Sequence, residues 1–217
     1  MKIYKAAIFD MDGTLVDTLA DLHDSVNEML AHYSLPLRTL DEVRQFVGNG
    51  AKKLMLRSLP EGCNFIDEAL DFYNACYARN CTNKVKPYAG IMEFLAALEA
   101  KKIPLGICTN KQNFAAVEIA EKILSPIKFS YVSGDEPNLP RKPDPTRALG
   151  IAEKFSVAPE KVAYFGDTAI DIQTAKNAGF LAVGVTWGFR PRSELVESGA
   201  KIIVDHPREI LEQINFD

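Results

Sequence analysis

Short apolar runs of strand length recur along the chain, and a helical pattern of apolar positions follows most of them. The six runs that we interpret as strands are residues 5–9, 104–108, 129–133, 162–165, 181–185 and 202–204. Most of them are apolar almost throughout, which is typical of strands that are covered on both faces. Because strands and helices alternate, the pattern predicts an α/β fold with a mostly parallel, Rossmann-like sheet.

Helical patterns fill most of the intervals between these runs. The segments that we interpret as helices are residues 91–101, 112–122, 146–155, 169–178 and 208–214. Gly179 directly follows one of them, and a glycine just past the last turn is a common helix stop.

One interval carries helical patterns and no convincing strand. The pattern therefore predicts a helical cap domain, residues 17–83, inserted after the first strand of the sheet. The core domain is then formed by residues 1–16 and 84–217, and Pro87 and Gly90 mark the linker that returns the chain to it.

Two pairs in the insert have the spacing of a capping box, in which two residues close the start of a helix. Thr39 precedes Glu42 by three positions, and Thr18 precedes Asp21 by the same interval. We expect a helix to begin after each threonine.

Length, composition and charge limit the classes of protein to which the chain can belong. The chain has 217 residues, 47% of them hydrophobic, and a formal charge of −4. This length suits one domain carrying a smaller insert. The acidic balance and the lack of a basic run argue against nucleic acid as a partner, and no apolar stretch approaches the length of a membrane span.

Cysteine and histidine usage points to a cytoplasmic protein without a zinc site. The four cysteines form no C-x-x-C pair and have the scatter of reduced thiols; they are Cys63, Cys76, Cys81 and Cys108. The three histidines lie far apart in the sequence.

Polar residues that are able to take part in catalysis or ligand binding cluster where the predicted strands end. Asp10 and Asp12 follow the first strand, Thr109 follows the second, and Asp167 and Asp171 follow the fourth. In open α/β sheets, functional groups gather beyond the carboxyl ends of the strands. We therefore expect these side chains to meet in one crevice.

These acids need a compensating cation. Lys142 lies in the same kind of place, in the segment RKPDP, but one lysine cannot neutralise four neighbouring carboxylates. Oxygen ligands without histidine or cysteine indicate a hard ion, and Mg²⁺ is the ion that we expect. The lysine, the Thr109 hydroxyl and free backbone N–H groups suit a phosphoryl group.

Four motifs in this order resemble those of the haloacid dehalogenase superfamily of hydrolases. They are DMDGTLVD at residues 10–17, TN at 109–110, KP at 142–143 and GDTAID at 166–171. The resemblance covers essentially the whole chain, and the helical insert matches the cap of that superfamily. Within it, VGNGAKKL and GVTWGFR are most similar to the phosphoglycolate phosphatases.

The resemblance implies a role for each matching residue. Asp10 is expected to be the nucleophile and Asp12 the general acid and base, while Thr109 and Lys142 hold the phosphoryl oxygens. The implied Mg²⁺ ligands are Asp10, the backbone carbonyl of Asp12 and Asp167, with Asp171 in support.

Four further positions are candidate substrate-binding residues. Gly13 lets the chain turn away from the site while its N–H groups stay free, and Asn110 belongs to the second motif. Gly48 and Gly50 suit phosphate or carboxylate binding, although a plain turn between helices explains them equally well.

The expected reaction is Mg²⁺-dependent hydrolysis of a small phosphorylated metabolite, with 2-phosphoglycolate favoured. Three alternatives share the motifs: a phosphomutase of the β-phosphoglucomutase type, a phosphatase for sugar phosphates, nucleotides or pyrophosphate, and an inactive binding protein on the same scaffold. The sequence leaves the substrate and the oligomeric state open.

Overall fold

A six-stranded sheet forms the centre of the computed structural model, which describes residues 2–217. All neighbouring strands pair in parallel, in the order β6-β5-β2-β7-β8-β9. The strands are β2 (Ala6–Phe9), β5 (Leu105–Gln112), β6 (Tyr131–Asp135), β7 (Val162–Gly166), β8 (Leu181–Val185) and β9 (Ile202–Val204). The predicted parallel α/β fold is confirmed.

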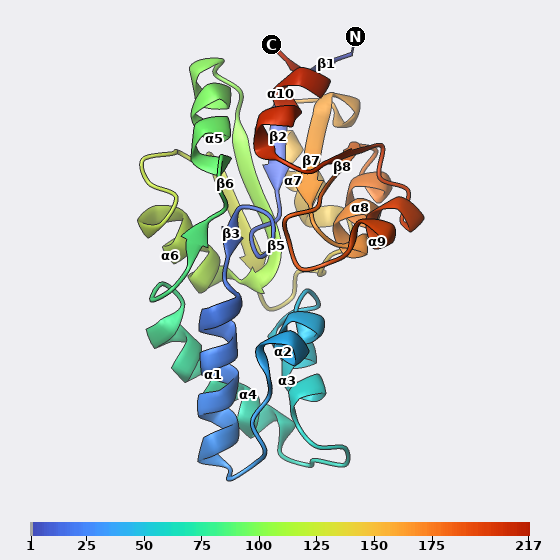
Figure 1. The fold of residues 1–217 in the computed structure, drawn as a ribbon. Coiled ribbons are helices and arrows are strands. Elements are labelled where there is room, and N and C mark those ends of the chain that lie inside the picture. The colour runs from blue at the N-terminus through green and yellow to red at the C-terminus, as the bar shows by residue number, and fades with distance from the viewer. Residues whose placement is uncertain (1) are drawn as a thin grey trace.

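Helices cover both faces of this sheet (Figure 1). Alternate residues of β2 point to opposite faces: Ala7 and Phe9 belong to one hydrophobic cluster, and Ala6 and Ile8 to another. The helices packed in the first cluster are α5 (Ile91–Ala100), α6 (Asn113–Lys122) and α10 (Ile210–Gln213). Those in the second are α7 (Thr146–Lys154), α8 (Ala169–Asn177) and α9 (Arg192–Glu197).

Four helices form a separate layer beyond the carboxyl ends of the strands (Figure 1). They are α1 (Leu19–His32), α2 (Leu40–Phe46), α3 (Ala51–Ser58) and α4 (Ile66–Asn80), hereafter the helical unit. The unit has its own hydrophobic cluster, which includes Val26, Met55 and Tyr73. The domain boundaries at 16/17 and 83/84 stay a prediction.

Among residues 2–217, no helix combines the length and apolar character that crossing a bilayer requires.

Two pairs of very short strands join distant parts of the chain. β1 (Ile3–Tyr4) pairs with β10 (Asn215–Phe216), which brings the two ends of the chain together (Figure 1). β3 (Val16–Asp17) pairs antiparallel with β4 (Lys86–Pro87) where the chain leaves the sheet and returns to it. Two-residue strands have no recognisable hydrophobic period, so the sequence analysis did not predict them.

The predicted C-terminal helix at residues 208–214 is wrong in its extent. A 3₁₀ turn occupies Pro207–Glu209, and α10 makes barely one turn before the chain becomes extended at Ile214. The chain leaves the helix there in order to pair with β1.

Two strand boundaries also differ from the prediction. β5 continues to Gln112 through the polar residues that we expected just after it, and β6 begins two residues later than predicted, at Tyr131. Register shifts between Cys108 and Gln112, so the polar end of β5 is irregular.

The two capping-box predictions have different outcomes. At Thr39 the box is present: its hydroxyl accepts from the Glu42 N–H at 3.3 Å, and Glu42 accepts from the Thr39 N–H at 2.8 Å. At Thr18 the predicted helix does begin, at Leu19, but the capping box is absent, because Thr18 Oγ1 donates to Asp12 at 2.8 Å. Asp21 turns away to accept from backbone N–H groups at the return crossing.

Candidate active site

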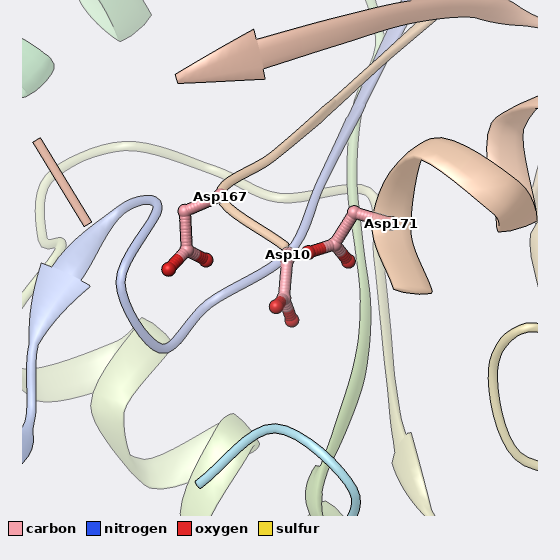
Figure 2. Close-up of side chains that lie close together, drawn as sticks. All are labelled: Asp10, Asp167 and Asp171. Carbon is pink, nitrogen blue, oxygen red and sulfur yellow. The ribbon is translucent and has the colours of Figure 1, made fainter. Parts of the chain in front are cut away.

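Three buried carboxylates from separate segments meet at the carboxyl ends of β2 and β7. Asp10 follows β2, Asp167 follows β7, and Asp171 lies in the first turn of α8. Each offers an oxygen within 4.8 Å of the others, and Figure 2 shows Asp167 and Asp171 on either side of Asp10. The predicted gathering occurs because β2 and β7 are parallel neighbours.

Lys142 supplies positive charge on one side of this cluster. Its Nζ lies 2.9 Å from Asp10 Oδ1 and 2.6 Å from Asp171 Oδ1. Burial alone lowers the pKa of the Lys142 ammonium, but the carboxylates of Asp10 and Asp171 outweigh burial and raise its pKa above the ordinary value. The lysine is therefore charged, and it neutralises only part of the cluster.

Burial and the remaining negative charge together raise the pKa values of the other two acids. Burial, followed by the charges of Asp171 and Asp10, raises the pKa of Asp167 well above its ordinary value. Burial and then the charge of Asp10 raise the pKa of Asp171 to about 6. A bound cation would relieve both effects.

The donor set fits a hard divalent cation. All three groups offer oxygen, and Asp10 Oδ1 is buried without a well-oriented hydrogen bond despite its nearness to Lys142. Carboxylate oxygens are the ligands that Mg²⁺ prefers. The residues present are thus suited to hold the ion that the sequence analysis expected.

The loop after β8 orients Asp167, a contribution that the sequence analysis missed. The Phe189 N–H donates to Asp167 Oδ2 at 2.7 Å, and Thr14 Oγ1 donates to Oδ1 at 3.2 Å. A Cβ on Gly188 would lie 2.3 Å from both the Gly13 carbonyl oxygen and Asp167 Cβ. Only glycine allows this approach, so part of the GVTWGFR motif belongs to the site.

Asp12 lies apart from the three-carboxylate cluster in an environment of its own. Its Oδ1 accepts from Thr18 Oγ1 and from Lys111 Nζ, each at 2.8 Å. Lys111 also donates to the Tyr77 hydroxyl on α4. The contacts of Lys111, Thr18 and Tyr77 with one another and with Asp12 were not predicted from the sequence, because nothing local to each residue indicates them.

Thr109 and Asn110 lie beside the cluster, at the irregular end of β5. The Thr109 hydroxyl is buried and accepts from the Lys111 N–H at 3.2 Å. The Asn110 side-chain amide binds backbone groups. Its oxygen accepts from the Lys142 N–H at 2.9 Å, and its nitrogen donates to the Gly48 carbonyl at 3.3 Å. Its hydrogen bonds in this structure therefore position the segment that carries Lys142.

A pocket lies between the sheet and the helical unit. Asp10, Asp12 and Thr109 line its floor, and the turn containing Gly48 and Gly50 lines its wall. Both glycines have positive φ, +116° and +85°, and Gly50 is the N-cap residue directly before α3. The turn between α2 and α3 thus faces the pocket. The cavity is small, at ≈ 50 Å³.

The comparisons with known proteins agree with this architecture. A phosphoglycolate phosphatase from Agrobacterium fabrum is 35% identical over 92% of this chain and 87% of its own length. An N-acetylmuramic acid 6-phosphate phosphatase from Pseudomonas aeruginosa is 33% identical over 97% and 95%. A crystal structure of a predicted phosphoglycolate phosphatase from Haemophilus somnus has a TM-score of 0.88 at 29% identity, covering 98% of this chain and 99% of that one.

The sequence-family model of the haloacid dehalogenase-like hydrolases matches residues 7–185 of this chain, from β2 to the end of β8. The matched range contains all four motifs and every residue of the three-carboxylate cluster. The chain therefore belongs to the haloacid dehalogenase-like hydrolase family.

Proposed function

We propose that the protein is a Mg²⁺-dependent phosphatase that hydrolyses a small phosphomonoester, with 2-phosphoglycolate favoured, through an aspartyl-phosphate on Asp10. One observation carries the proposal: Asp10 and Asp12 have different surroundings although they are two residues apart. Asp10 contacts Lys142 within the acidic cluster, whereas Asp12 pairs with Lys111 and Thr18. Two carboxyl groups in unlike environments suit two roles in one reaction.

Asp10 is the nucleophile in this scheme. An oxygen of its carboxylate attacks phosphorus, and the bond between phosphorus and the ester oxygen breaks. Lys142, 2.9 Å from Asp10 Oδ1, reduces the repulsion between the carboxylate and the anionic phosphate. Thr109 and the backbone N–H groups of Met11 and Asp12 hold the phosphoryl oxygens. The Gly13 N–H does not stay free as expected, because it donates to the Val16 carbonyl at 3.0 Å, and the Thr14 N–H donates to the Met11 carbonyl at 3.2 Å.

Asp12 moves the protons. It gives one to the departing alkoxide in the first step and takes one from water in the second. That water attacks the phosphorus of the aspartyl-phosphate, which releases inorganic phosphate and restores Asp10. The position of Asp12 outside the three-carboxylate cluster leaves its side chain available for this task.

Asp10, the Asp12 carbonyl and Asp167 would hold Mg²⁺, with Asp171 in support. When bound, the ion would neutralise charge on the phosphoryl oxygens and on the carboxylates. Phe189 N–H and Thr14 would keep Asp167 oriented toward it.

The substrate must fit in the pocket between the sheet and the helical unit, under the turn that carries Gly48 and Gly50. Two relatives are named for phosphoglycolate and N-acetylmuramic acid 6-phosphate, both phosphorylated acids. We propose residues 17–83 as the cap that closes over the substrate, with Gly48, Gly50 and Asn110 in its binding wall.

A phosphate-release screen tests the function. Phosphoglycolate, sugar phosphates, nucleotides and pyrophosphate would be offered with Mg²⁺ and with EDTA. We expect release from phosphoglycolate, complete loss in EDTA and recovery with Mg²⁺. Isomerisation of a sugar phosphate without phosphate release would instead establish the phosphomutase, and no turnover of any substrate would leave a binding protein.

Asp10→Asn and Asp12→Asn separate the two roles. Asp10→Asn should abolish hydrolysis of every substrate, because no covalent route remains. Asp12→Asn should lower turnover of an alkyl phosphate about 10²- to 10⁴-fold. With p-nitrophenyl phosphate, whose leaving group departs without a proton, Asp12→Asn should still give a burst of nitrophenolate near one equivalent in rapid-quench kinetics. A burst from Asp10→Asn would show that the roles are reversed.

A further inference from the structure

The proposed mechanism leaves one buried cation in the pocket without a role. Lys111 is the residue, and its side chain is only 2% exposed. Its Nζ lies 2.8 Å from Asp12 Oδ1, donates to the Tyr77 hydroxyl and lies 4.7 Å from the centre of the Tyr77 ring. Burying an ammonium costs several kcal/mol unless partners compensate it, so a lysine here needs a reason.

The rest of the pocket wall on the side of the helical unit is apolar or aromatic. The side chains that contribute to it are Leu22, Val47, Leu54, Tyr73, Tyr77 and Phe189. Among the pocket-lining residues in the described part of the chain, Lys111 carries the one positive charge. A negatively charged leaving group that enters this pocket therefore has one cationic partner to meet.

We propose that Lys111 is a specificity-determining residue that binds a carboxylate on the leaving group, so that the enzyme prefers phosphate esters of small hydroxy acids. The proposal rests on the function proposed above. It adds a residue on β5, outside the helical unit, to those that select the substrate.

The position of Lys111 relative to Asp12 supports this reading. A general acid must lie within about 3 Å of the ester oxygen that it protonates. Lys111 Nζ lies 2.8 Å from the Asp12 carboxylate, so the ammonium lies close to the ester oxygen that Asp12 would protonate. A leaving-group carboxylate that is joined to the ester oxygen by a single methylene group spans the separation between that oxygen and the ammonium.

A matched pair of substrates tests the proposal. 2-Phosphoglycolate and 2-hydroxyethyl phosphate differ only in replacement of the carboxylate by a hydroxymethyl group. The wild-type enzyme should have a kcat/KM at least 10-fold higher for 2-phosphoglycolate. In Lys111→Met, the loss for 2-phosphoglycolate should exceed the loss for 2-hydroxyethyl phosphate by about 10- to 100-fold, the effect of one charge-assisted hydrogen bond, and most of the excess should appear in KM.

Two conservative variants and one binding measurement complete the design. Lys111→Arg keeps the charge and should recover most of the preference, and Tyr77→Phe should retain it because the ammonium remains. In an Asp10→Asn background, calorimetry should show weaker binding of 2-phosphoglycolate when Lys111→Met is added.

Equal losses on both substrates would overturn the proposal, since Lys111 would then act only through Asp12. A wild-type enzyme without preference for the carboxylate would overturn it too, even where Lys111→Met fails to fold. In both outcomes the enzyme still releases phosphate, so the proposed phosphatase function stands. Failure of the wild type to release phosphate from any ester would instead refute the proposed function.

Discussion

Asp167 and Asp171 are acids whose pKa is raised in the folded protein, by burial first and by neighbouring carboxylates next. A raised carboxyl pKa means that the folded state binds the proton more tightly than the unfolded chain. The stability that each acid contributes is therefore fully present below its ordinary pKa of 3.8. It is lost as pH rises, through about 6 for Asp171 and through a pKa well above the ordinary value for Asp167.

Removing one of these charges should therefore stabilise the metal-free protein. In EDTA at pH 7.5, Asp167→Asn should raise the melting temperature above that of wild type, and the gain should shrink as pH falls toward 4. Each kcal/mol corresponds to about 2–4 °C in a protein of this size. Differential scanning fluorimetry measures the shift across the pH range.

Mg²⁺ should reverse the order, because it stabilises wild type and not Asp167→Asn. The control is Asp67→Asn, on a side chain that is 82% exposed and paired with Lys52, which should change little under either condition. A melting temperature of Asp167→Asn at or below that of wild type in EDTA would contradict the account of the acidic cluster.

At the scale of elements, Asp21 ties α1 to the segment that returns to the sheet. The carboxylate is 1% exposed and accepts from the backbone N–H groups of Lys84, at 2.9 and 3.0 Å, and Val85, at 3.0 Å. These N–H groups have no helix or sheet partner of their own in that segment, so the side chain replaces a piece of secondary structure.

Asp21→Asn should therefore destabilise the protein by about 2–4 kcal/mol, since an amide NH₂ would face buried N–H donors. Urea denaturation gives the free energy of unfolding. Asp24→Asn is the matched control: Asp24 lies on the same helix, and its ion pair with the Lys84 ammonium is exposed, so its loss should cost about 1 kcal/mol or less. Equal effects of the two substitutions would argue against a bridging role for Asp21.

The sequence placed the main acids well, for a physical reason. Asp10 and Asp167 follow hydrophobic strands, and parallel strands bring their carboxyl ends to one edge whatever the details of packing. Lys111 and Tyr77 are different, because their contact depends on how α4 packs above β5. No local pattern encodes that packing, and the same holds for the Phe189 N–H that orients Asp167.

At the scale of the whole molecule, Arg190 fastens the helical unit to the core. Its guanidinium donates to the carbonyls of Arg44 and Val47, each at 2.7 Å, and of Gln45, at 3.1 Å, at the end of α2. A cation at a helix C-terminus is favourable, and these carbonyls lead directly into the turn with Gly48. The contact holds that turn over the pocket.

Arg190→Met should weaken the attachment of the turn with Gly48 to the core without unfolding the protein. We expect kcat/KM for 2-phosphoglycolate to fall about 10-fold, the effect of one or two charge-assisted hydrogen bonds. Amide hydrogen exchange should accelerate at residues 48–51. Arg192→Met serves as the control, because Arg192 lies only two residues further on, at the start of α9, but pairs with Asp205 at an exposed site. Unchanged exchange in Arg190→Met would mean that other contacts hold the turn.

The pairing of β3 with β4 pins the two ends of the helical unit side by side. The entropic cost of closing a loop grows only with the logarithm of its length, by about 0.6 kcal/mol for each doubling. The stretch between Asp17 and Lys86 can therefore be lengthened, shortened or replaced while the sheet keeps its register. Much of the pocket wall lies on that stretch, so a single recombination event in the gene could pass a new substrate preference to an unchanged catalytic floor.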